Sequence, residues 1–131
     1  MKTIVTGITL SSIAFVGSIL LFYSAYIGHQ ALADLKADYG VQTVSGWYDL
    51  QPARDLFHGP LAFESELLYH SPLIFPVSAI CATVGLLIGC SNTNSVPKRI
   101  CLSLGLGTLF LLGFTWTNYA DSIYIVSVIV D

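Results

Sequence analysis

The chain has 131 residues, of which 54 % are hydrophobic and 10 % charged, and its mean hydropathy is +0.73. A soluble domain carries about 25 % charged residues, so this composition excludes a water-soluble enzyme and a disordered chain. Five basic residues against eight acidic ones form no basic patch for phosphates, which excludes nucleic acid as a partner. The composition therefore predicts an integral membrane protein of one domain.

Three apolar stretches are long enough to cross about 30 Å of hydrocarbon as helices, which takes about 20 residues. They run over residues 4–27, 72–90 and 100 to about 119, and none of them contains Asp, Glu, Lys, Arg or His. The first stretch is longer than the apolar part of a cleaved signal peptide, so we expect an uncleaved anchor. The prediction is an all-α membrane protein in which residues 1–131 form a single membrane domain with three transmembrane helices.

Basic and acidic residues separate along the chain. Lys2 precedes the first span, and Lys98 and Arg99 lie in the link 91–99. All eight acids fall in the segment 28–71 or in the tail 120–131, where Lys36 and Arg54 are the only bases. The positive-inside rule places the N-terminus and the link in the cytoplasm and the segment and the C-terminus outside. This topology predicts a multi-pass protein of a bacterial inner membrane.

The outer segment 28–71 shows helix signals at both ends. The first helix is expected to continue to Tyr39, with Gly40 as the residue that ends it. A second short helix is expected over 60–70, and Ser71-Pro72 is a start signal for the second span.

Two stretches of β-branched residues give a less definite prediction of secondary structure. Residues 41–48 are β-branched and aromatic and predict a short strand. Residues 123–130 either prolong the third span or pair with 41–48 as a strand. We favour the strand, which gives a small β element outside the membrane.

Small residues recur at helical spacing within each span, which predicts close helix packing in lipid. In the first span the small residues lie alternately four and three residues apart and so form one helix face, which is interrupted at Leu21. The second span ends in a GxxxG motif. The predicted packing residues are Gly7, Ser11, Ala14, Ser18, Ser78, Ala82, Gly85, Gly89, Ser103 and Gly107. The pattern leaves open whether these faces meet one another or another chain.

His29 and His70 stand at the outer ends of the first two spans, so two imidazoles could share a haem or a metal. The architecture resembles the three-span membrane anchors of quinone-linked dehydrogenases, but the usual anchor pattern of His followed by Arg and Ser is absent. We expect no cofactor, with interfacial, hydrogen-bonded histidines instead. Cys81, Cys90 and Cys101 show no C-x-x-C spacing and are expected to be apolar thiols rather than disulfides.

These observations favour a non-catalytic membrane protein, because pumps and ion pathways usually place ionisable groups inside the membrane. The leading hypothesis is an accessory or structural subunit whose partners are other membrane subunits and lipid. The first alternative is an inner-membrane immunity or modulator protein that binds an incoming partner. The second is a redox anchor that uses His29 and His70.

Overall fold

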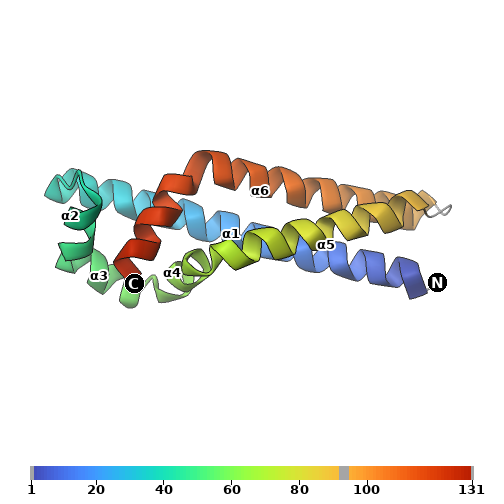
Figure 1. Cartoon of the computed structure of the whole chain (residues 1–131), viewed down its shortest axis with the longest axis horizontal. Helices are drawn as coiled ribbons and strands as arrows, with labels where there is room; N and C mark the ends of the chain where they lie inside the picture. Colours follow the sequence, from blue (N-terminus) through green and yellow to red (C-terminus); the bar gives the residue numbers. More distant parts are fainter. Residues whose placement is uncertain (1, 92–94, 131) are drawn as a thin grey trace. The chain divides into compact units, whose positions relative to one another are not determined.

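A computed structural model describes residues 2–91 and 95–130 and folds them into six α-helices (Figure 1). The helices are α1 (Lys2–Tyr39), α2 (Val44–Asp49), α3 (Gln51–His58), α4 (Ala62–Tyr69), α5 (Ser71–Ser91) and α6 (Ser95–Val130). Residues 92–94 of the predicted link, and the final tail residue 131, lie outside the described residues.

Three of the helices are long and apolar enough to cross a membrane, as a multi-pass membrane protein requires. They cover Thr3–Tyr39 with 37 residues, Ser71–Ser91 with 21 and Ser95–Val130 with 36. The predictions of an all-helical chain and of three such helices are confirmed. The short helix expected over 60–70 is α4, and α5 begins at the Ser71-Pro72 signal. Helix α3 was not expected from the sequence.

The predicted strand over 41–48 is wrong, because the structure has α2 there and no strand within 2–91 or 95–130. Thr43 is extended (φ −120°, ψ 155°), and its hydroxyl accepts a hydrogen bond of 3.1 Å from the Gly46 backbone N–H. This is the geometry of a helix N-cap, which satisfies one of the unpaired donors of the first turn. The local cap prevails over the β propensity of the segment.

The strand preferred for 123–130 is also wrong, and the alternative is correct: these residues prolong α6 to Val130. Ile123, Val126 and Ile129 are all buried, and each is three residues from the next. Residues at that spacing share a face of a helix but alternate between the faces of a strand. Burial of this one face explains why β-branched residues continue the helix.

Residues 28–39 belong to α1, so the predicted continuation of the first helix to Tyr39 is confirmed. The part of the segment 28–71 that lies outside the long helices is therefore shorter than the whole segment: it begins at Gly40 and ends before Ser71.

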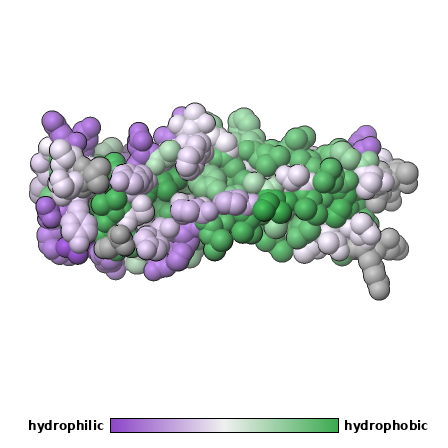
Figure 2. Space-filling model, in the orientation of Figure 1, coloured by the Kyte–Doolittle hydropathy of each residue, from purple (hydrophilic) through white to green (hydrophobic). Residues whose placement is uncertain are grey.

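The chain divides into two compact units, to which α1 and α6 both contribute. Unit 1 consists of Met1–Leu20 and Pro72–Phe114, and unit 2 of Leu21–Ser71 and Thr115–Asp131. All eight acidic residues belong to unit 2, whereas the charged residues of unit 1 are the three bases Lys2, Lys98 and Arg99. Figure 2 shows hydrophobic side chains along the helices of unit 1 and hydrophilic ones over α2 and α3 of unit 2.

Unit 1 has an interior of small side chains. The fully buried residues include Ser11, Ala14 and Ser18 on α1, Ala82 on α5 and Cys101 and Thr108 on α6. Two of the buried hydroxyls bond to their own helix: Ser18 donates to the Phe15 carbonyl (2.8 Å) and Thr108 to that of Leu104 (2.7 Å). Such bonds let a hydroxyl lie in an apolar interior without the cost of an unpaired polar group.

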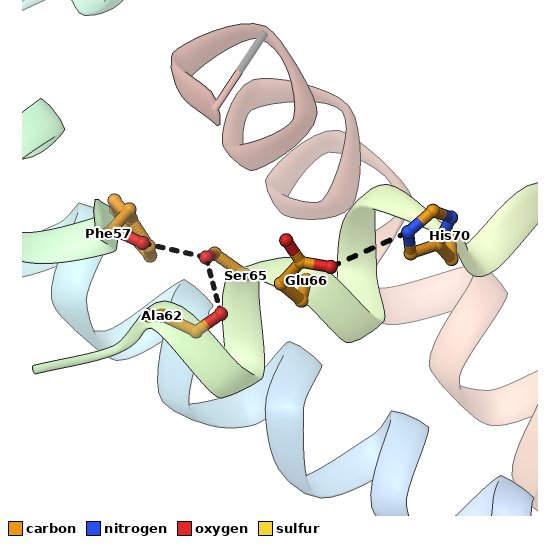
Figure 3. A network of polar contacts seen from close by, with 5 residues as sticks. All are labelled: Phe57, Ala62, Ser65, Glu66 and His70. Atoms are coloured by element: carbon orange, nitrogen blue, oxygen red, sulfur yellow. Dashed lines mark hydrogen bonds and ion pairs between the residues drawn. The ribbon is translucent and has the colours of Figure 1, made fainter. Parts of the chain in front are cut away.

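Unit 2 has a core of larger side chains, among them Leu21, Leu32, Trp47, Phe57, Leu68, Val126 and Ile129. One buried hydroxyl ties α3 to α4 in this core (Figure 3). Ser65 Oγ lies 2.7 Å from the Phe57 carbonyl oxygen and 2.9 Å from that of Ala62, and it donates to this pair. The bond spans eight residues of sequence and therefore fixes the turn between the two helices.

Gly40 ends α1 as the sequence predicts. Its φ is +66°, and its N–H donates to the Lys36 carbonyl over 2.8 Å. A positive φ of this size is costly for residues with a β-carbon and routine for glycine. The cap turns the chain out of α1 toward α2.

We expect Gly40→Ala to lower the free energy of unfolding by about 1 kcal/mol through backbone strain alone, because no atom lies within 4 Å of the added β-carbon. Gly40→Asn is the control, since asparagine tolerates the left-handed conformation better. Unfolding in detergent micelles, followed by circular dichroism, measures both. Equal losses for the two variants would contradict the backbone explanation.

Candidate functional site

The helices of unit 1 approach closely where α5 meets α1. A β-carbon added to Gly85 would overlap the Ser11 hydroxyl and lie 3.3 Å from the Gly7 carbonyl oxygen. One added to Gly7 would lie 2.6 Å from a methyl group of Ile88. These positions admit only glycine unless a neighbour moves, and dispersion contacts between closely packed backbones are what hold helices together in lipid.

The contact of α5 with α6 follows the same rule. A β-carbon on Gly89 would lie 2.7 Å from that of Cys101, and one on Gly105 would lie 3.1 Å from the Ala82 carbonyl oxygen. Two residues of α6 were predicted to pack against the other helices. Gly107 lies near Phe15, but Ser103 is exposed. The buried positions of α6 within unit 1 are instead Cys101, Gly105, Thr108 and Leu112.

The predicted packing residues on α1 and α5 all face inward. Gly7, Ser11, Ala14 and Ser18 are buried on α1, as are Ser78, Ala82, Gly85 and Gly89 on α5. The structure thus brings these faces together within one chain.

The outward side chains of unit 1 are bulky and apolar. Those exposed by about 60 % or more include Ile13, Leu73, Ile80, Leu87 and Phe110. In water such a surface would be unfavourable, whereas hydrocarbon suits it.

The histidines of unit 2 have different partners. His29 Nδ1 lies 2.7 Å from the Ser122 hydroxyl, and its ring centroid is 5.3 Å from that of Tyr119. His70 Nε2 lies 3.5 Å from a carboxylate oxygen of Glu66 (Figure 3). Each imidazole thus has a polar neighbour of its own.

The three cysteines are free thiols. Cys81 is half-buried, Cys90 exposed and Cys101 buried.

A groove of about 360 Å³ opens in unit 2, and the sequence did not reveal it. Its lining comes from α1, from the loop that leads into α2, from α2 itself and from the end of α6. The lining residues are His29, Leu32, Ala33, Lys36, Val41, Gln42, Trp47, Ser122 and Ile125. On α1, residues 29, 32, 33 and 36 share one helix face by spacing, which is the sequence signal that could have pointed to this surface.

Comparison with known protein families, curated proteins and solved structures finds no match to this chain.

We expect Gly85→Ala to lower the free energy of unfolding by about 1–3 kcal/mol, the usual cost of overpacking. Ser11→Gly removes the two atoms closest to the new β-carbon and leaves the Gly7 carbonyl oxygen, so the double variant should recover most of the loss. Denaturation in micelles of the wild type, both single variants and the double variant completes the cycle.

Gly113→Ala is the control for this series, because no atom lies within 4 Å of its added β-carbon. It should not destabilise the chain. A double variant that loses as much stability as the sum of the two single variants would show that Gly85 and Ser11 do not meet.

Proposed function

We propose that this chain is a non-catalytic, multi-pass accessory subunit of a larger membrane protein complex. In this proposal unit 1 anchors the chain in the bilayer and unit 2 makes the contacts that matter for assembly. The observation that carries the proposal is the separation of charge. Every acidic residue belongs to unit 2, while the buried side chains of unit 1 are mostly small and all uncharged.

The interior of unit 1 supports an anchoring role. Glycine, alanine and hydroxyl side chains make up most of it, together with Cys101 and Leu112, and the predicted spans contain no Asp, Glu, Lys, Arg or His. Ion pathways and proton relays depend on ionisable groups inside the membrane. An anchor needs only tight internal packing and an apolar exterior, and unit 1 has both.

The surface of unit 2 supports a role in binding. The acids Asp34, Asp38, Asp49, Asp55, Glu66 and Asp121 are exposed. Unit 2 has two basic residues, Lys36 and Arg54. The Arg54 guanidinium carbon lies 5.2 Å from the centroid of the Tyr48 ring, and Lys36 lines the groove. A partner with a basic surface would complement these exposed carboxylates and would be steered to them.

The topology of the proposal follows the charges. With Lys2, Lys98 and Arg99 in the cytoplasm, the N-terminus lies inside and unit 2, with the C-terminus, lies outside. The membrane of this proposal is a bacterial inner membrane.

Gentle detergent extraction followed by native mass measurement tests the proposal. We expect a stable complex of the chain with at least one different protein. Asp34→Lys with Asp38→Lys should release that partner, because it reverses two exposed charges of unit 2. Leu87→Ile, on the apolar exterior of unit 1, is the control and should leave the mass unchanged.

Other outcomes would favour the alternatives. A monomer or homo-oligomer without a partner would contradict the subunit proposal and favour a stand-alone immunity or modulator protein. A haem absorption band that disappears in His70→Gln would favour the redox anchor.

Cysteine labelling tests the topology with the native thiol as one of its reporters. Cys90 is exposed near the end of α5, and we expect a membrane-impermeant thiol reagent to reach it only after cells are permeabilised. In a Cys90→Ser background, Ser45→Cys, which replaces an exposed side chain of α2, should react in intact cells. The reverse pattern would overturn the orientation.

A further inference from the structure

We propose that the groove of unit 2 binds the phosphate head group of an anionic phospholipid, with Lys36 as its counter-charge. This site goes beyond the proposed subunit role and does not depend on it. The groove volume of about 360 Å³ suits a head group and lies at the lower end of the range for small-molecule sites.

The charge of the groove is positive, although unit 2 as a whole is acidic. Lys36 is the only formally charged side chain among the described residues that line it. Asp34 and Asp38 are each two residues from Lys36, which is about 200° around α1. Both carboxylates therefore lie on the side of α1 away from the groove, and an anion meets the ammonium group without meeting them.

Two further hydrogen-bond donors line the same groove. The Gln42 amide and the His29 ring line the groove together with Lys36. When the Ser122 hydroxyl donates to His29 Nδ1, the neutral ring carries its proton on Nε2 and becomes a donor. A lysine, an amide and an imidazole N–H together match a phosphate, which offers only acceptor oxygens.

The apolar part of the lining indicates a lipid rather than free phosphate. Leu32, Trp47 and Ile125 give the groove its apolar lining. Inorganic phosphate gains nothing from such a surface, whereas the glycerol and first acyl carbons of a lipid bury apolar area against it.

The position of the groove along the helices also fits a head group. His29 stands two residues after the last residue of the uncharged stretch 4–27. The exposed aromatic residues Tyr26 and Trp116 belong to the same unit. Tyrosine and tryptophan favour the level of lipid head groups, so the His29 end of the groove lies near the depth of the lipid phosphates. Lys36 stands about two helical turns further along α1.

Trp47 reports directly on the site because it lines the groove. In a Trp116→Phe background it is the single tryptophan of the chain. We would titrate this protein, in a non-ionic detergent, with short-chain phosphatidylglycerol, with phosphatidylcholine of the same chain length and with inorganic phosphate. Phosphatidylglycerol should give a saturable change in Trp47 emission, and the other two probes should not at the same concentrations.

Lys36→Gln should weaken phosphatidylglycerol binding about tenfold, the scale of one lost charge-assisted hydrogen bond. Arg54→Gln is the matched control, because it removes the other base of the segment 28–71 and does not line the groove. It should change the affinity less than about twofold. Ala33→Leu, which fills the groove without changing charge, should weaken binding as well.

Three results would overturn the proposal. Equal losses for Lys36→Gln and Arg54→Gln would show general electrostatic attraction. Equal binding of phosphatidylcholine would show that the groove does not distinguish an anionic head group from a zwitterionic one. Saturation by inorganic phosphate at the same concentration would show a site for the free anion. Circular dichroism of each variant separates loss of binding from loss of folding.

Discussion

The packing of unit 1 depends on the close approach of α5 to α1 at Gly85. Within hydrocarbon the hydrophobic effect does not press helices together, so their association depends on dispersion contacts between surfaces that fit closely. Gly85 and Gly7 carry no side chain, and Ser11 and Ala82 carry small ones, which lets the helices meet near their backbones. The bulky side chains then point outward, where lipid accommodates them. The same choice of residues therefore produces both the interior and the exterior of the unit.

Unit 2 is held together by different interactions, as its larger buried side chains show. Phe57, Leu68 and Trp47 remove much more apolar area from water than the small residues of unit 1 do. Its short helices also have end and turn contacts: the Thr43 cap begins α2, and Ser65 joins α4 to α3. These interactions suit a part of the chain that meets water, where burial is favourable and exposed carboxylates cost nothing.

Features that depend on long or strong local patterns could be predicted from the sequence. The spans, the turn at Gly40 and the start at Ser71-Pro72 belong to this class. The helical tail was missed because β-branched residues suggest a strand, whereas the burial of Ile123, Val126 and Ile129 depends on tertiary contacts. On α6, Ser103 and Gly107 were chosen for their small size, but the buried series includes Cys101 and Gly105. A cysteine packs like a small apolar residue, so counting it would have located that face. The groove joins α1, α2 and the end of α6, and no local pattern indicates that these three meet.

The interruption of the small-residue pattern at Leu21 has a structural meaning. On α1 the heptad face runs through Ser11, Ala14 and Ser18, and the next position of the series is the fully buried Leu21. The boundary between the two units falls directly before this residue. A large side chain at that position is incompatible with the close backbone approach that unit 1 uses, but it suits the larger core of unit 2. One continuous helix can thus serve two kinds of packing, because the size of its inward side chains changes along its length while its backbone does not.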